Sequence, residues 1–429
     1  MEKLSSTANQ AFLNENYQEA ENILRGLTKE RTVSLPLFQM ELLSVLIMNG
    51  KHQEAHQLME DIHQDLEMLF DDEMAEKALS VWSGEVNKVY KGDAYERSTF
   101  YLFMALSFIQ QEKYEDAVSC VKNGLLADAD SRMENATRDY AMLHYIGFLA
   151  SMKMGKNKDA DEYLKWMIEA LEIRREIPET EKNELRQKFI SDFSEKNTNV
   201  LLVLWAGTPP SVECIGDYKE IRAVVRGSNP FDMISVSVNN SLPYYPGNLL
   251  GDIDYQASFV GGRLMDNVLA NKAAAKKAME TTGNIFFIAG STCLIVANSV
   301  ADLNVKLIFL GSGVGCYALG AGAYIVGYMM NPAADSRYWK NLPGQLYLLP
   351  LHLKPGEYNL MFAGYKRSDL TGMLLDKITV NSDAGMQVFH MPMMVQGMNI
   401  NNAIRENFKS EVKKINAKAQ ASRLEKELK

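Results

Sequence analysis

Residues 14–20 read NENYQEA, and related strings recur as NGKHQEA at 49–55, QEKYEDA at 111–117 and GKNKDA at 155–160. Each string follows an apolar stretch whose large side chains recur at three- and four-residue steps, the spacing of a helix with one buried face. Gly or Asn can turn the chain at the end of a helix, and a small alanine lets the next helix pack closely. The pattern predicts helical hairpins over residues 1–175.

The hairpin unit resembles the tetratricopeptide repeat (TPR), whose period is about 34 residues. The alanines that end the four strings are 35, 62 and 43 residues apart, so the array is irregular. A nonrepeating helical bundle is the alternative. Stacked repeats bury one face against their neighbours and leave a concave face open, where a partner can bind.

Strand-like runs dominate the second half. Apolar or alternating segments lie at 200–205, 221–225, 232–238, 345–353, 358–365, 374–380 and 387–392. Residues 354–357 read KPGE and predict a turn between two of these segments. An apolar strand, this turn and a second strand together resemble the PEGA-type β module of cell-envelope proteins. The resemblance implies a β hairpin in a small sandwich-like domain with no chemistry of its own.

Two long uncharged segments interrupt the strands. Residues 281–301 and 307–334 contain no Asp, Glu, Lys or Arg, and each is long enough for a helix that crosses a bilayer. Basic residues before the first segment, and Arg337 after the second, would keep both ends on one side of a membrane. The alternative is a pair of buried helices packed against the sheet. Small residues at four-residue spacing, which let helices approach closely, are Gly311, Gly315, Ala323 and Gly327.

These patterns predict an α+β protein in which N-terminal TPR-like helical-hairpin repeats precede a small β-sandwich-like domain that a hydrophobic helical hairpin interrupts. The expected parts are a helical repeat domain at 1–175, a charged helical linker at 176–199, the first part of the β domain at 200–259, a basic helix and hydrophobic hairpin at 260–334, a PEGA-like β module at 335–396 and a charged C-terminal helix at 397–429.

The composition indicates a folded protein without a recognisable reaction centre. Of 429 residues, 54 are acidic and 45 basic, and the net charge of −9 disfavours nucleic acid as a partner. The cysteines and histidines lack metal-ligand spacing, and the glycine and serine motifs of nucleotide-binding proteins and hydrolases do not occur. We therefore expect no catalytic residue, cofactor or metal. For the carboxylate pair Asp252 and Asp254, a helix N-cap is favoured over catalysis.

Four short motifs follow one another along the chain: YKGDAYE at 90–96, AGTPP at 206–210, DID at 252–254 and DSRYWKNLP at 335–343. Over about residues 85–365, this series resembles a poorly characterised bacterial family of TPR-containing envelope lipoproteins. The last motif is the sharpest and fits D-[ST]-R-x-W-x-x-L-P. The family-motif residues carried over to this chain are Tyr90, Gly92, Tyr95, Glu96, Asp252, Asp254, Asp335, Arg337, Trp339 and Pro343.

The resemblance implies a helical-repeat domain joined to a β domain, an envelope setting and no known enzymatic activity. We expect Asp335 and Arg337 to form an ion pair and Trp339 to pack over Pro343, with binding as their less favoured role. Two departures bear on localisation. Family members begin with a lipoprotein signal and a lipidated cysteine, and the N-terminus here shows neither. The uncharged region also exceeds the family's usual single helix.

The favoured interpretation is a noncatalytic TPR-type scaffold of a bacterial cell-envelope assembly, associated with the membrane, with other proteins as its partners. The alternative is a membrane-inserting or pore-forming protein that uses the Gly-rich hairpin at 281–334, with a lipid bilayer and further copies of itself as partners. A lesser alternative is an unrecognised hydrolase that uses Asp252 and Asp254.

Overall fold

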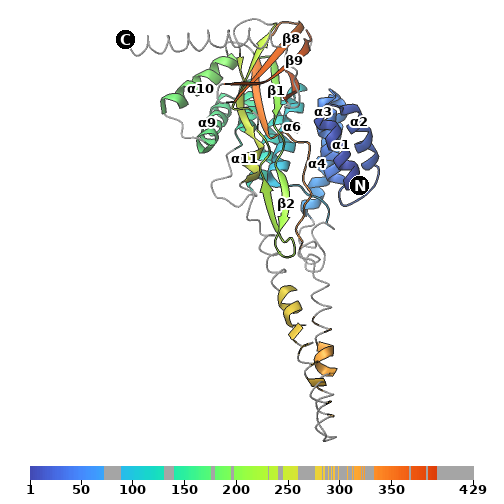
Figure 1. Ribbon diagram of the computed structural model, residues 1–429. Helices are drawn as coiled ribbons and strands as arrows, with labels where there is room; N and C mark the ends of the chain where they lie inside the picture. Colours follow the sequence, from blue (N-terminus) through green and yellow to red (C-terminus); the bar gives the residue numbers. More distant parts are fainter. Residues whose placement is uncertain are drawn as a thin grey trace.

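Helices form an arc around two sheets at one end of the molecule, and the described helical pieces between 276 and 323, called the projection below, lie beyond the other end (Figure 1). Besides single residues and short pieces between 284 and 323, the computed structural model describes residues 1–71, 88–129, 140–174, 179–194, 198–229, 231–239, 245–258, 276–282, 333–366, 369–382 and 385–393.

The N-terminal half is a row of helical hairpins, as predicted. The pairs are α1 (Glu2–Leu13) with α2 (Tyr17–Leu27), α3 (Leu35–Met48) with α4 (His52–Asp71), α6 (Ala94–Gln110) with α7 (Tyr114–Ala129), and α8 (Ala141–Lys153) with α9 (Asn157–Arg174).

The turn strings do what the sequence predicts, with one difference. The alanines that end them are at most 2% exposed, because the paired helices approach closely there: Ala20, Ala55, Ala117 and Ala160. The left-handed turn position is Gly50 in one hairpin and Gly155 in another, but it is Glu15 and Glu112 in the other two. Glycine is therefore not required at this turn, although a glutamate there carries a modest backbone strain.

Helix α10 (Glu179–Ser194) continues the row beyond α9. Its Phe189 is buried, and the Phe189 ring lies 5.6 Å from the ring of Tyr145 in α8. The helix expected in the charged linker at 176–199 is therefore present, and it packs on the repeats.

The C-terminal half contains two four-stranded sheets and a two-stranded ribbon. The inner sheet has the order β10 (Gln387–Met393), β1 (Val200–Ala206), β7 (Gln345–Leu351) and β6 (Asn248–Asp252). The outer sheet has the order β5 (Tyr245–Pro246), β4 (Met233–Val238), β8 (Gly356–Lys366) and β9 (Asp369–Val380). The ribbon pairs β2 (Ser211–Ile215) with β3 (Ile221–Val225), and a short helix, α11 (Ile253–Ser258), follows β6.

Strand β1 belongs to two hydrophobic cores at once. Leu201, Val203 and Trp205 pack among the helices. The alternate residues, among them Leu202 and Leu204, pack against the outer sheet. Successive side chains of a strand point to opposite faces, so a strand buried on both sides reads as one continuous apolar run.

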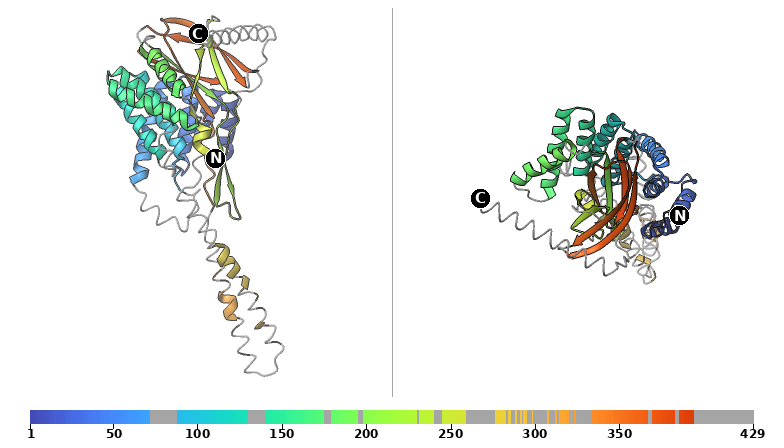
Figure 2. Two further views of the ribbon diagram at one scale, coloured as in Figure 1. Left: turned by 90° about the vertical axis from the view of Figure 1, so that its left-hand side faces the viewer. Right: turned by 90° about the horizontal axis from the view of Figure 1, so that it is seen from above.

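The inner sheet fills the inner face of the helical row. Strand β10 contacts α3 and α6, and β6 contacts α8. The ring of Phe103 in α6 stacks on that of Trp205 at 4.9 Å and 6°. Seen from above, the helices form an arc around the sheets (Figure 2, right). The expectation of an open concave face is therefore wrong, because the chain's own sheet occupies it.

The expectation that the strands on either side of the PEGA-like turn pair as a hairpin is also wrong. The turn at 354–357 joins β7 of the inner sheet to β8 of the outer sheet. Strand β7 pairs with β1 and β6, whereas β8 pairs with β4 and β9. Strands β9 and β10, which follow one another in the chain, likewise lie in different sheets. Each of these connections crosses from one layer of the sandwich to the other.

Most residues of the two uncharged segments, 281–301 and 307–334, lie outside the described residues, as do 259–275 and 397–429. Where the structure can be searched, it contains no helix long and apolar enough to span a bilayer. The described pieces are helical, and the hydroxyls of Ser291 and Tyr317 lie 2.7 Å apart and join two of them. Five of their large apolar side chains are 57–67% exposed: Ile285, Ile288, Leu307, Val314 and Leu319.

Candidate functional site at the helix–sheet junction

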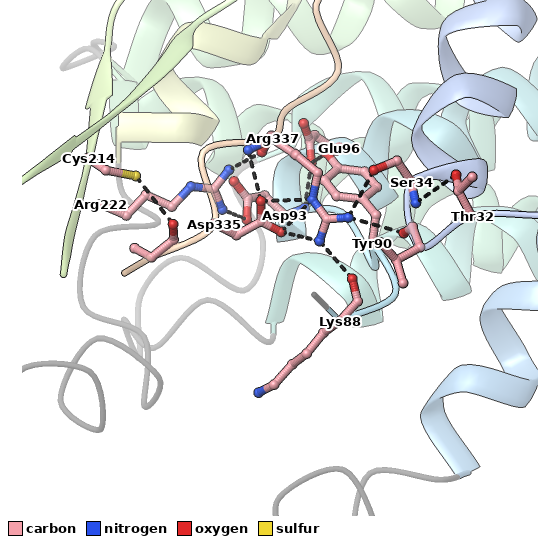
Figure 3. Close-up of polar contacts among 12 residues, drawn as sticks. Thr32, Ser34, Lys88, Tyr90, Asp93, Glu96, Cys214, Arg222, Asp335 and Arg337 are labelled. Carbon is pink, nitrogen blue, oxygen red and sulfur yellow. Dashed lines mark hydrogen bonds and ion pairs between the residues drawn. The ribbon is translucent and has the colours of Figure 1, made fainter. Parts of the chain in front are cut away.

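Motif residues from distant parts of the chain meet where the helical row, the ribbon and residues 334–343 come together (Figure 3). Residues 334–343 are called the motif segment below. The motif residues gathered there are Tyr90, Gly92, Tyr95, Glu96, Asp335, Arg337 and Trp339.

Glu96 is a fully buried carboxylate in the first turn of α6. It accepts hydrogen bonds from the Tyr90 hydroxyl, the Asp93 backbone N–H and the Trp339 backbone N–H, each at 2.6 Å. With Asp93 it forms the capping box of α6. Burial raises the pKa of Glu96, and the charge of Arg222 opposes that rise. Glu96 therefore joins the start of a repeat helix to the motif segment.

The guanidinium of Arg337 is held on several sides. Its Nε and Nη2 donate to the Asp335 carboxylate at 2.7–3.0 Å, which confirms the predicted ion pair. Nη1 also donates to the Val33 carbonyl at 3.1 Å, and Nη2 to the Lys88 carbonyl at 2.8 Å. The guanidinium lies 5.4 Å from the centre of the Tyr90 ring. One side chain thus fastens the motif segment to two loops of the helical row.

Arg222 is the junction residue that sequence reasoning missed. It lies on β3, is buried, and donates from Nη1 to Asp93 at 2.6 Å and from Nη2 to the Arg337 carbonyl at 2.8 Å. The only sequence signal is a charged residue inside the short apolar strand at 221–225. Through Arg222 the ribbon is tied to both the repeats and the motif segment.

Trp339 is fully buried beside α3 and α6. Its Nε1 donates to Asn341 at 2.8 Å and to Ser44 at 3.1 Å, and its ring meets Phe103 edge-on at 6.1 Å. Pro343 is buried, and its packing with Trp339 stays a prediction. The contacts of Trp339 are those of a structural anchor.

A second buried acid holds the motif segment to the first hairpins. The Ser5 hydroxyl donates to the Glu41 carboxylate at 2.9 Å, and Lys340 Nζ lies 3.2 Å from the same hydroxyl. The Asn341 side-chain amide donates to the Glu41 backbone carbonyl at 2.7 Å. Burial raises the pKa of Glu41 to about 7, against the opposing charge of Lys340.

Asp252 and Asp254 lie at the start of α11. The Asp252 carboxylate accepts from the Tyr255 N–H at 3.0 Å, which is the N-cap arrangement that the sequence favours. The Asp254 carboxylate accepts from the Gly227 N–H at 2.9 Å and ties α11 to the loop after β3. Burial raises the pKa of Asp254 to about 6. Both carboxylates thus have structural partners, which weakens the hydrolase alternative.

A cavity of about 20 Å³, enough for one water molecule, lies between α3, α4, α6 and β10. Beside it, Ser107 Oγ lies 3.1 Å from His56 Nδ1, and His56 Nε2 lies 3.4 Å from Glu60. Acyl transfer also needs N–H donors aimed at an oxyanion. Ser107 lies within α6, where the backbone N–H groups bond along the helix and are not available as such donors. We therefore assign no reaction to Ser107, His56 and Glu60. Across the described ranges, no group of three His, Cys, Asp or Glu could hold a metal.

His390 of β10 closes the same region. Trp205 Nε1 donates to His390 Nδ1 at 3.0 Å, so the neutral ring carries its proton on Nε2. The Phe103 ring meets His390 edge-on at 6.0 Å. Burial lowers the pKa of His390 to about 3, and nearby His52 adds to this shift. His390 is thus built into the contact between repeats and sheet as a neutral acceptor.

Of the four residues proposed for membrane packing, the structure describes Gly315 and Ala323. Gly311 and Gly327 lie outside the described residues. Gly315 is exposed, with nothing within 4 Å of the place where a Cβ would stand, and Ala323 is partly exposed. Close helix packing at these positions stays a prediction. Arg337, expected as a basic flank of a membrane segment, is instead buried in the junction.

No family model and no curated protein sequence matches the chain. The similar solved structures include two crystal structures of nearly identical TPR-like repeats, assigned to a kinesin light chain of Podosopora anserina. Both are 16% identical to this chain, cover 46% and 45% of it and 95% and 96% of their own length, and have TM-scores of 0.29 and 0.28. TM-scores this low carry no argument about the fold. The description of the repeats therefore rests on the helices of this structure.

Replacing Arg337 by Lys should lower the free energy of unfolding by about 2–4 kcal/mol, because an ammonium cannot reproduce the forked contacts and leaves buried partners unsatisfied. Arg186→Lys is the matched control, since Arg186 is more exposed and pairs with Asp161 through one nitrogen, Nη2. That change should cost less than about 0.5 kcal/mol. Urea unfolding followed by circular dichroism measures both, and equal effects would contradict the role given to Arg337.

The neutral state of His390 contributes a stability that is lost in mild acid, whereas the raised pKa values of Glu41 and Asp254 act in the opposite direction as the pH falls. The folded protein protonates His390 only near pH 3, whereas the ordinary histidine pKa is 6.5, so for this group lowering the pH between these values favours the unfolded chain. The loss is at most about 1.4 kcal/mol per pH unit. His390→Gln keeps an acceptor for Trp205 and removes this contribution, so the variant should gain stability relative to the parent in urea titrations as the pH falls from about 7 to 5. A variant as pH-sensitive as the parent would refute the assignment.

Proposed function

We propose that the chain is a noncatalytic scaffold protein of a bacterial cell-envelope assembly. The observation that carries the proposal is the buried junction, in which Glu96, Arg222 and Arg337 lock the repeats, the ribbon and the motif segment into one body. A body held in this way keeps its surfaces at fixed positions relative to one another, which is what a scaffold needs.

The filled inner face limits where partners can bind. Since the inner sheet packs against α3, α6 and α8, we expect partner proteins to bind on other surfaces, such as the outer helices of the row. The envelope setting is inferred from the motif resemblance alone.

The scaffold proposal predicts a stable partner protein. Affinity capture of the full chain from gently solubilised native membranes should retain at least one other protein in fixed ratio through size-exclusion chromatography. A chain that elutes as a lone monomer from native membranes under every solubilisation condition would reject it.

A second candidate function is insertion into a membrane through 281–334. The observation in its favour is the exposure of Ile285, Ile288 and Val314 on pieces that carry no charged residue on any face. A helix that is apolar all round belongs inside a protein or a bilayer. A second copy could cover one face of such helices, but the remaining faces would still meet water, so the bilayer is the better occupant.

Insertion predicts that the purified chain floats with vesicles of phosphatidylethanolamine and phosphatidylglycerol and resists carbonate extraction. Ile288→Glu combined with Val314→Glu should lower the bound fraction about tenfold, because a carboxylate in hydrocarbon is costly. Leu375→Glu is the matched control, since Leu375 is an equally exposed residue of β9 in the outer sheet, and it should bind as the parent does. Full release of the parent protein by carbonate would reject insertion.

A further inference from the structure

The tip of the β2–β3 ribbon, residues 214–221, is fastened to the base of the projection. The Tyr218 hydroxyl donates to the Glu280 carboxylate at 2.5 Å. Lys277 Nζ and the Asp217 carboxylate form an ion pair at 2.6 Å, and Lys276 Nζ lies 5.0 Å from the centre of the Tyr218 ring. These contacts hold the helix that leads into the first uncharged segment.

The returning chain is held by the same tip. The Ala334 N–H donates to the Lys219 carbonyl at 2.9 Å, and Cys214 Sγ donates to the Ala334 carbonyl at 3.7 Å. In the sequence, the uncharged region begins directly after Glu280 and ends at Ala334. The ribbon tip therefore lies at the level where the first uncharged segment starts and the second one ends.

One face of the ribbon exposes apolar side chains at this level. Ile215 and Ile221 are register partners on neighbouring strands, 50% and 47% exposed, and Val225 lies on the same face of β3 at 40%. The opposite face of β3 carries Arg222 into the junction and packs Val224 against the helical core. Among the charged residues of the tip, Asp217 is paired within the protein with Lys277.

We propose that this tip rests in the membrane–water interface, with Ile215 and Ile221 among the lipid headgroups and the upper acyl chains and with Tyr218 at headgroup level. The inference rests on the insertion of 281–334 proposed above. Tyrosine with neighbouring apolar side chains suits that layer, which is apolar on one side and wet on the other. The lipid bilayer is preferred over a protein partner because the apolar pair is continuous with the ends of the uncharged segments.

The test uses the full chain with a fluorophore that reports lipid contact. Cys214, Cys293 and Cys316 are replaced by Ser, and buried Cys120 is kept. A single NBD label is then attached in three separate variants, Ile221→Cys, Ile288→Cys and Leu375→Cys. Vesicles of phosphatidylethanolamine and phosphatidylglycerol carry a nitroxide either at the headgroup or deep in the acyl chain.

We expect the label at 221 to be quenched about threefold more by the headgroup nitroxide than by the deep one, and the label at 288 to show the reverse order. The label at 375 should not be quenched. Quenching at 288 without quenching at 221 would overturn the ribbon proposal and leave insertion standing. Absence of quenching at both would overturn insertion and the ribbon proposal together. A spectral shift at 221 that follows protein concentration, without quenching by lipid, would assign the face to a second copy and overturn the proposal.

Discussion

Strand β1 is stable only between two apolar layers, and the rest of the fold follows from this. Its residues from Val200 to Ala206 are all buried, with alternate side chains in two different cores. Both sets are apolar, so polarity does not fix the register of the strand. Shape does: Trp205 must meet the Phe103 ring on one side and His390 on the other. Neither the repeats nor the sandwich can release β1 without exposing its own core, so the two parts are one structural unit.

The buried junction fixes the position of the repeats relative to the ribbon and the motif segment. Apolar surfaces tolerate small displacements, whereas the forked bonds of Arg337 and the ion pair of Arg222 with Asp93 allow one position. Taking such charges out of water costs several kcal/mol per ion, and the cost is offset only when the hydrogen bonds are well made. The raised pKa of Glu96 records the part of that cost that remains. The junction therefore contributes specificity of assembly more than net stability.

Local features could be predicted from the sequence, and long-range pairings could not. The buried alanines of the repeats and the strand at 221–225 are encoded by spacing and side-chain type over a few residues. Strand β1 instead pairs Val200 with Gln387 on one side and with Leu351 on the other, a choice that no local pattern specifies. The motif resemblance named many of the junction residues in advance, but it did not include Arg222. A lone arginine in a short strand suggests a solvent-facing position until Asp93, 129 residues earlier, is seen beside it.

The ribbon shows how the buried junction and the exposed surface constrain each other. Ile221 and Arg222 are neighbours on β3, so their side chains must point to opposite faces. Because Arg222 is committed to Asp93 and to the Arg337 carbonyl, Ile221 has to face outward, and cross-strand pairing places Ile215 beside it. A one-residue slip that hid the isoleucines would pull the guanidinium out of the junction and leave buried acids without their counter-charge. The exposed apolar pair is thus a consequence of the buried ionic one, and whatever covers the ribbon tip contacts the strand that holds the junction closed.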